Sequence, residues 1–206
     1  MDMEAAFTIL QQEHFLIESS PHSAQFQSLT GCLLRLFSES SVIPGLSEPE
    51  IRLYSLLACL HDIGKRAIPP KILNKPGKLT RQEYDLMKSH TTQGCELLRQ
   101  VPELRSCEAF PLLCDVCRHH HERWDGGGYP DGLAGAGITP WVHVVGLADA
   151  FDALLHMRPY KPAYSPDQAA SMITSGACGT FAPEMTACFG WNIAAIVHTV
   201  YCGYVR

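Results

Sequence analysis

The chain has 206 residues, of which 46% are hydrophobic and 18% are charged, as expected for one globular domain with a sizeable core. Its formal net charge of −5 excludes a general basic surface for long nucleic acid. No apolar run reaches the roughly 18 residues of a spanning helix and the start "MDMEAAFTIL" lacks signal-peptide features, so we expect a cytoplasmic protein without membrane insertion.

The first predicted element is a helix over 20–38. Apolar residues recur there at helical spacing, and the pair Ser20-Pro21 is typical of an N-cap followed by proline in the first turn. Residues 1–19 then form a short N-terminal extension, and we assign 20–206 to a single domain.

Three capping boxes predict further helix starts, because paired side chains there satisfy the free N–H groups of a first turn. The pairs are Ser47 with Glu50, Thr80 with Glu83 and Ser165 with Gln168. Apolar spacing predicts the other helices, and Pro and Gly punctuate the connections. After the first, the predicted helices are 48–62, 81–100, 109–121, 140–157, 166–176 and 184–202. No segment alternates as a strand, so we predict an all-α bundle.

Nine cysteines, an odd number, lie mostly within apolar periodic segments, and we expect buried thiols in a reducing compartment. Cys114 and Cys117 have the C-x-x-C spacing of zinc and redox sites, but no second such pair exists. Together with Cys107 they share one helical face, which favours packing over a functional role.

Histidine and aspartate residues recur near apolar sequence on separate predicted helices. The candidates are His61, Asp62, His90, His120, His121 and Asp149. Bundles build metal sites from inward side chains of facing helices, and imidazole with carboxylate suits iron or manganese. Neighbouring helical residues point about 100° apart, so an adjacent pair serves two ions, or one ion with help from the helix end. Asp62 can bridge both ions.

These residues stand in blocks that resemble the HD-GYP family, a subgroup of the HD-superfamily metal-dependent phosphohydrolases. The matching blocks are "HDIGK" at 61–65, "IPPKILNKPGKLT" at 68–80, "HHERWDGGGYPDG" at 120–132, "LADAFDALLHMRPYK" at 147–161 and, more loosely, "GTFAPEMTACF" at 179–189. So many ordered blocks over roughly 20–190 are far more specific than any single one. The resemblance implies an HD-type helical bundle with a buried multi-metal site.

The resemblance also implies roles for individual residues. The implied metal ligands are His22, His61, Asp62, His90, His120, His121 and Asp149, with Glu18 as the ligand of a third ion. Two or three divalent ions, iron or manganese, are the expected cofactors. Lys65 and Asp62 would act in catalysis, with Lys65 steadying developing charge or the leaving oxygen. The implied substrate contacts are Arg158, Lys161, Asp152, Gly128, Tyr129 and Pro130.

The remaining histidines are expected to have no role as ligands. His14, His143, His156 and His198 have no partner at ligand spacing in a motif, so we expect surface or satisfied core residues there. His119 abuts the ligand pair, and we favour a supporting or surface position for it.

The implied substrate is cyclic di-GMP, opened to the linear dinucleotide pGpG and then to GMP. A water bridging the ions would lose a proton and attack, while the ions neutralise charge on the phosphoryl oxygens. The loop 126–130 would shape the site entrance and contact partners, including diguanylate cyclase domains; a plain tight turn is its equal alternative. Two other functions stay open: an HD phosphohydrolase for another nucleotide, or a non-catalytic nucleotide-binding or adaptor module.

Overall fold

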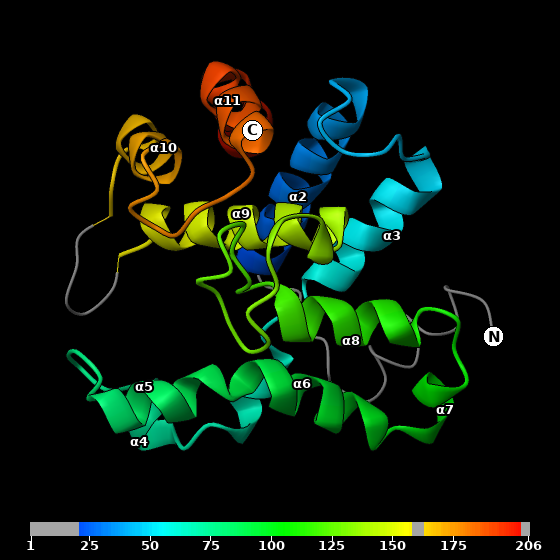
Figure 1. Cartoon of the computed structure of the whole chain (residues 1–206), viewed down its shortest axis with the longest axis vertical. Helices are drawn as coiled ribbons and strands as arrows, with labels where there is room; N and C mark the ends of the chain where they lie inside the picture. Colours follow the sequence, from blue (N-terminus) through cyan, green and yellow to red (C-terminus); the bar gives the residue numbers. More distant parts are fainter. Residues whose placement is uncertain (1–20, 158–162, 203–206) are drawn as a thin grey trace.

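The structure is a computed structural model that describes residues 21–157 and 163–202 (Figure 1). The regular secondary structure of these ranges is helical, and no β-strand forms in them. The predicted all-α fold is therefore confirmed. Three predicted site residues and the predicted extension lie outside the described residues: Glu18, Arg158, Lys161 and 1–19.

Most of the helices follow one another with short connections, whereas the segment 120–139 between α8 and α9 is long. In chain order they are α2 (Pro21–Glu39), α3 (Glu48–Ala58), α4 (Pro70–Leu73), α5 (Arg81–Lys88), α6 (His90–Arg99), α7 (Pro102–Arg105), α8 (Phe110–His119), α9 (Pro140–Leu155), α10 (Pro166–Thr174), α11 (Pro183–Trp191) and α12 (Ile193–Val197). Short 3₁₀ turns lie at η1 (Ile63–Ala67) and η2 (Gly135–Gly137), and a π-helical turn, η3, lies at His198–Cys202. None of the described helices combines the length and apolar character that a membrane crossing requires.

Helix α9 crosses the middle of the molecule, between α2 and α3 on one side and α8 and α6 on the other (Figure 1). It packs against α2, α8 and α10, and buried apolar residues occur all around it, as expected for a central helix. Phe151 of α9 meets Phe189 of α11 edge to face at 5.1 Å, with both rings buried. The helix that carries Asp149 is thus held on several sides by the core.

The three predicted capping boxes begin helices at the expected places. The backbone N–H groups of Ser47, Thr80 and Ser165 donate to the side chains of Glu50, Glu83 and Gln168 at 2.8, 2.7 and 3.0 Å. These contacts start α3, α5 and α10, because each satisfies a donor that the first helical turn leaves free.

The prediction of one helix over 81–100 is wrong, since the segment forms α5 and α6 with a break at Ser89. The N–H of Ser89 donates to the carbonyl of Leu86 at 3.1 Å, and the Ser89 hydroxyl donates to the same carbonyl at 2.7 Å. This tighter local bonding interrupts the α-helical ladder. His90 consequently begins a new helix instead of lying within a long one.

The helix predicted over 48–62 ends at Ala58, four residues early. The chain tightens there, because the N–H of His61 donates to the Ala58 carbonyl at 3.1 Å, three residues back. His61 and Asp62 therefore lie on a turn between α3 and η1. In the same way α8 ends at His119, so the predicted ligands His120 and His121 follow the helix instead of lying within it. The helix predicted over 184–202 divides into α11, α12 and the π-helical turn.

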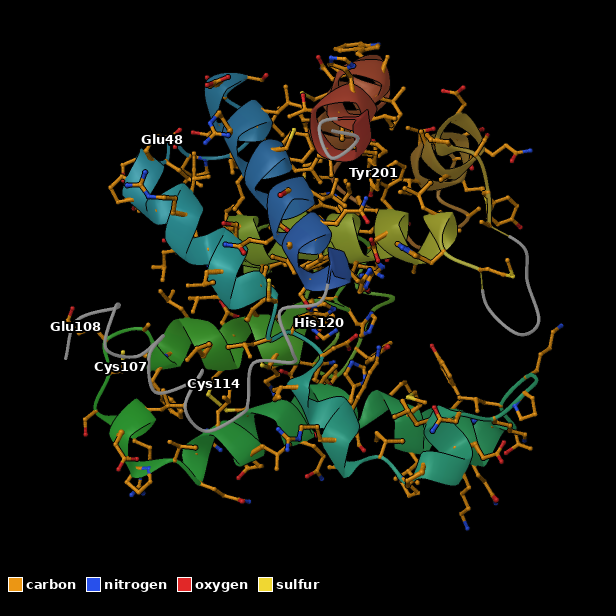
Figure 2. All side chains as sticks on the ribbon, turned by 180° about the vertical axis from the view of Figure 1, so that it is seen from behind. Glu48, Cys107, Glu108, Cys114, His120 and Tyr201 are labelled. Atoms are coloured by element: carbon orange, nitrogen blue, oxygen red, sulfur yellow. A yellow bond between two sulfur atoms is a disulfide. The ribbon has the colours of Figure 1, made fainter. Side chains whose placement is uncertain are left out.

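The expectation that all cysteines are thiols is wrong at one pair. Cys95 of α6 and Cys114 of α8 form a disulfide, because the two helices pack side by side and bring the Cα atoms to 4.8 Å (Figure 2). Cys117 does not join that bond. It is buried, its Sγ lies 3.3 Å from the carbonyl of Leu60, and burial raises the pKa of its thiol.

Candidate metal centre

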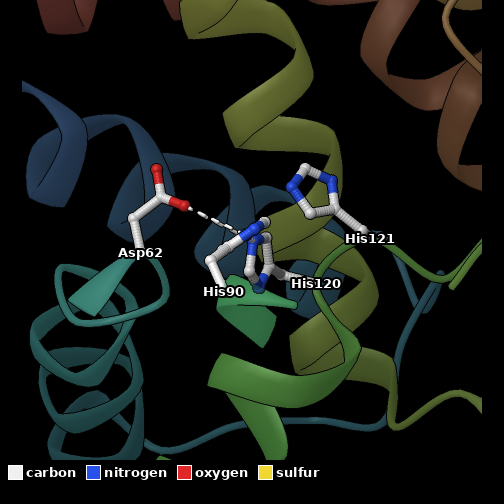
Figure 3. Close-up of side chains that lie close together, drawn as sticks. All are labelled: Asp62, His90, His120 and His121. Atoms are coloured by element: carbon white, nitrogen blue, oxygen red, sulfur yellow. Dashed lines mark hydrogen bonds and ion pairs between the residues drawn. The ribbon is translucent and has the colours of Figure 1, made fainter. Parts of the chain in front are cut away.

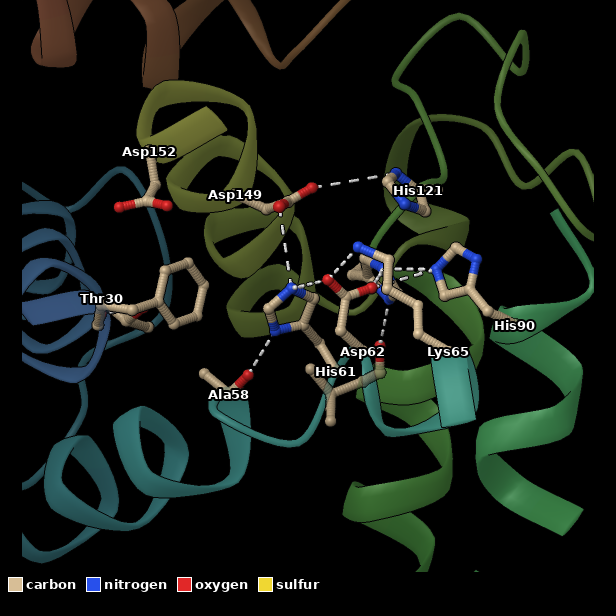
Figure 4. A network of polar contacts seen from close by, with 12 residues as sticks. Thr30, Ala58, His61, Asp62, Lys65, His90, His121, Asp149 and Asp152 are labelled. Carbon is tan, nitrogen blue, oxygen red and sulfur yellow. Dashed lines mark hydrogen bonds and ion pairs between the residues drawn. The ribbon is translucent and has the colours of Figure 1, made fainter. Parts of the chain in front are cut away.

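Two groups of ligand atoms share the carboxylate of Asp62 (Figures 3 and 4). One group is Asp62, His90, His120 and His121, and the other is His61, Asp62 and Asp149; the ligand atoms within each group lie within 4.8 Å of one another. Oδ1 of Asp62 lies 3.3 Å from Nε2 of His90 and 3.8 Å from Nε2 of His120. Oδ2 lies 3.3 Å from Nε2 of His61. The two oxygens of one carboxylate thus face different groups.

Backbone carbonyls fix the orientation of three imidazoles. The Nδ1 atoms of His61, His90 and His120 lie 2.7, 2.7 and 2.9 Å from the carbonyl oxygens of Ala58, Met87 and Val116. A ring nitrogen that contacts a carbonyl must carry the proton, so the lone pair of each neutral ring is on Nε2. In its neutral form each ring thus directs this lone pair toward Asp62, in the tautomer that a metal ligand requires.

Two buried atoms of the centre lack hydrogen-bond partners among the described residues. They are Nε2 of His61 and Oδ1 of Asp62. Buried polar atoms without partners are costly, and a cation in each of the two groups would satisfy one of these atoms. The groups offer imidazole nitrogen and carboxylate oxygen without thiolate, a donor set that fits iron, manganese or a similar ion.

The electrostatics of the centre also favour a cation. Burial lowers the pKa of His120, and it lowers the pKa of His121 to about 3, so both rings are neutral at pH 7. Burial also acts to lower the pKa of His61. The carboxylates of Asp62 and Asp149 raise it by more than burial lowers it, so that this pKa is about 10. These carboxylates therefore attract positive charge to the side of the centre where His61 lies.

Two glycines allow the segments that carry ligands to meet. A Cβ atom on Gly64 of η1 would lie 1.9 Å from the carbonyl oxygen of His90, and one on Gly146 of α9 would lie 2.4 Å from that of His120. Only glycine permits such an approach of one backbone to another. The turn that carries Asp62 can therefore pack closely against His90, and the helix that carries Asp149 can pack closely against His120.

A third group, called the outer group because its two histidine side chains are exposed, contains His22, Asp152 and His156. Oδ2 of Asp152 lies 3.6 Å from Nε2 of His22 and 3.5 Å from Nδ1 of His156. Asp152 is only 7% exposed, and its Oδ1 has no hydrogen-bond partner within the described ranges. The structure thus brings His22 to Asp152, which the sequence assigned to substrate binding; that substrate contact stays a prediction.

His156 is the member of this group that the sequence analysis left out. It lies within the block 147–161, but no partner at ligand spacing pointed to it as a ligand. Its position four residues after Asp152 was the available signal, since residues four apart on a helix are neighbours on one face.

The loop that follows α8 folds back onto the centre. The ring of Tyr129 stacks on His121 with ring centroids 4.7 Å apart, and the Tyr129 N–H donates to the His121 carbonyl at 3.3 Å. The carboxylate of Glu122, which is buried, accepts hydrogen bonds from the N–H groups of Asp131 and Leu133 at 2.7 and 3.0 Å. The arrangement favours a loop that shapes the site over a plain turn.

Other histidines lie outside the three groups. His119 contacts Asp131 at 2.9 Å and therefore anchors the loop. His143 is buried between Trp124 and Phe181, with ring centroids 5.7 and 5.5 Å away, and its Nε2 has no described hydrogen-bond partner. His119 thus has the supporting position favoured for it, whereas His143 lies in the core as expected but without a described hydrogen-bond partner for Nε2.

The fold and the paired groups define an HD-type helical domain. The HD domain family profile matches residues 21–184, and the chain belongs to that family. A solved structure with a similar fold is Bd1817, a HDG"Y"P protein from Bdellovibrio bacteriovorus, with a TM-score of 0.60 and 18% identity over 86% of this chain and 55% of that one. The resemblance to the HD-GYP group is confirmed.

Curated relatives share more of the sequence. The cyclic di-GMP phosphodiesterase response regulator RpfG of Xanthomonas campestris pv. campestris (strain 8004) is 49% identical over 61% of this chain and 32% of its own length. The 3'3'-cGAMP-specific phosphodiesterase 2 of Vibrio cholerae serotype O1 is 36% identical over 68% of this chain and 26% of its own. The chain thus spans about a third or less of these relatives.

Proposed function

We propose that this chain hydrolyses a phosphodiester bond of a cyclic dinucleotide, with cyclic di-GMP as the first candidate. The observation that carries the proposal is that the two oxygens of Asp62 face two different ligand groups, 3.3 Å from His90 and 3.3 Å from His61. Paired ions joined by one carboxylate suit the in-line displacement of a phosphodiester. The activity named for the 49% identical relative supports the same substrate class.

We further propose two ions at the groups that share Asp62 and a third at His22, Asp152 and His156. The inner donor set of imidazole and carboxylate suits iron or manganese. The unpartnered Oδ1 of Asp152 supports the third position, because a buried carboxylate oxygen without a donor is costly. Glu18, predicted as a ligand there, stays a prediction.

Bound ions would supply an activated water and neutralise charge on the phosphoryl oxygens. The residues of the chain perform the remaining tasks. Asp62 orients both groups, and the ammonium of Lys65, which contacts its Oδ2, is positioned to stabilise negative charge on the leaving oxygen. Tyr129 covers one face of His121 and keeps water from it. Arg158 and Lys161 stay predicted phosphate contacts.

The first product is proposed to be linear pGpG, with GMP following if the linear dinucleotide binds again. A second substrate candidate is 3'3'-cGAMP, because a relative specific for it is 36% identical over 68% of the chain. The predicted contact of the loop 126–130 with diguanylate cyclase domains rests on the family resemblance alone. A non-catalytic binding module is the alternative to be excluded.

The test is turnover by metal-loaded protein. The chain is purified without oxygen, loaded with Fe²⁺ or Mn²⁺, and incubated with cyclic di-GMP or 3'3'-cGAMP, and the products are separated by chromatography. We expect pGpG from cyclic di-GMP, and no product after chelation of the metal. Tight nucleotide binding by metal-loaded protein without any product from either substrate would instead establish the non-catalytic module.

A further inference from the structure

Two cavities meet at the paired groups. One, of about 390 Å³, lies between α2 and α9 against His61 and Asp62. The other, of about 540 Å³, lies between α4–α5 and the rings of His90 and His121. Lys65 and Asp149 line both cavities, so a single ligand at the metal centre can extend into each. Both volumes lie in the range of roughly 300 to 1,000 Å³ that is typical of small-molecule sites.

Helix α5 borders the larger cavity and has no buried residue. Its Tyr84 lines the cavity and is 49% exposed, although large aromatic side chains usually contribute to a core. The ammonium of Lys88 lies 5.4 Å from the centre of the Tyr84 ring. Core packing therefore does not explain why a large aromatic side chain lies at this position. A planar ligand that stacks on Tyr84 in the cavity would explain it.

Positive charge accompanies this exposed ring. Lys75 and Lys78 line the same cavity, and Lys75 is paired with Glu83 at 2.5 Å. Lys78 is exposed and forms no ion pair with any described residue. An aromatic platform beside an unpaired cation is the combination that binds a base together with its phosphate.

The chemistry of a cyclic dinucleotide requires such a place. Its two phosphates lie on one ring, and only the phosphate that is cleaved can lie at the centre built on Asp62. The other half of the molecule must then leave the centre on one side. We propose that the cavity beside α5 is a nucleotide subsite, in which one nucleobase stacks on Tyr84 and Lys78 contacts the phosphate that is not cleaved. This inference rests on the proposed function and deepens it.

The test compares two substrates of the metal-loaded protein. Bis(p-nitrophenyl) phosphate is a phosphodiester with neither a nucleobase nor a second phosphate, so it reaches the metal centre without the groups that the subsite is proposed to bind. In Tyr84→Ala we expect the ratio of kcat/KM for cyclic di-GMP to kcat/KM for bis(p-nitrophenyl) phosphate to fall roughly tenfold to a hundredfold. Tyr84→Phe, which keeps the ring, should restore most of that ratio.

Two control variants separate the subsite from general effects. Leu86→Ala alters a residue of α5 that is 42% exposed and lies outside the cavity lining, and it should leave the ratio unchanged. Lys78→Ala should lower the ratio, whereas Lys71→Ala on α4, outside the lining, should not.

The outcomes distinguish the subsite from the function. An unchanged ratio in Tyr84→Ala, whether both activities persist or both fall together, would overturn the subsite and leave the proposed function standing. A wild-type protein that cleaves bis(p-nitrophenyl) phosphate but neither cyclic di-GMP nor 3'3'-cGAMP would overturn the proposed function, and the subsite with it.

Discussion

The inner and outer ligand groups are built differently, although α9 contributes an aspartate to both. In the inner groups His90 and His120 are almost fully buried, and backbone carbonyls hold their rings. In the outer group the side chains of His22 and His156 are 57% and 45% exposed, and Asp152 alone is buried. The inner ligands are fixed before an ion arrives, whereas the outer imidazoles can adjust around one.

Because of this difference, an ion at the inner groups and an ion at the outer group should contribute differently to catalysis. Fixed ligands set the spacing of paired ions and so suit chemistry that depends on geometry. Exposed ligands exchange with water at little cost, so an ion there is held less tightly. Substitutions in the inner groups should therefore have larger effects than substitutions in the outer one.

The largest effect is expected from Asp62→Ala, which removes the ligand that both inner groups share. Loss of paired ions removes several kcal/mol of transition-state stabilisation, so cyclic di-GMP turnover should fall by at least about 10³-fold. Metal content should fall too, while circular dichroism keeps its helical signal because Asp62 lies in a turn. Asp167→Ala, at an exposed position on α10, is the control. Normal turnover and metal content would refute the shared-ligand account.

Gly64→Ala tests whether the close approach of η1 to α6 fixes the inner ligands. The added Cβ would meet the His90 carbonyl at 1.9 Å, so the turn must shift, and we expect about 3 kcal/mol of lost stability together with weaker metal binding. Gly45→Ala is the matched control, because no atom lies within 4 Å of its added Cβ. Denaturant unfolding and metal titration measure both effects. Equal behaviour of the two variants would contradict the role given to this contact.

His143 shows what burial does to a histidine outside the ligand groups. Burial, with Arg123 adding to it, lowers the pKa of His143 from 6.5 to about 4. As pH falls below 6.5 the unfolded chain takes up this proton first, so native stability declines until about pH 4. His143→Phe should remove about 2 kcal/mol of that decline by pH 5. Urea unfolding of metal-free wild type and variant at pH 7 and pH 5 measures the difference. Parallel losses in both proteins would argue against it.

The smallest effect is expected from His156→Ala in the outer group. Metal content should drop by about one ion per chain while the inner pair remains, and turnover should fall far less than in Asp62→Ala. If Glu18 is a ligand of the same ion, Glu18→Ala should lower the content similarly. His198→Ala, which alters an exposed histidine outside all three groups, is the control. Unchanged metal content in His156→Ala would leave the outer group without an ion.

The inner ligands could be predicted from the sequence because they stand in ordered motif blocks. His61, Asp62, His90, His120, His121 and Asp149 all lie in the two groups that the structure assembles. The helix boundaries around them could not be predicted, since i→i−3 bonds at His61 and Ser89 are local adjustments without a periodic signal. These adjustments matter, because ligands on turns can share an ion as neighbours within a helix cannot.

Features that depend on packing between distant segments were missed. The disulfide of Cys95 and Cys114 requires α6 to lie along α8, which no sequence spacing reveals. His156 joins the outer group because α9 faces α2 at His22. The exposure of Tyr84 was missed for the same reason. The capping box at Thr80 predicts the start of α5, but it does not indicate that no residue of this helix is buried.

The central claim is that Asp62 joins two ions in one centre. Electron paramagnetic resonance of protein loaded with two Mn²⁺ ions per chain tests this claim directly, because ions bridged by a carboxylate couple magnetically and separate ions do not. We predict the spectrum of a coupled pair in the wild type and its loss in Asp62→Ala. A wild-type spectrum of isolated Mn²⁺ alone would contradict the account.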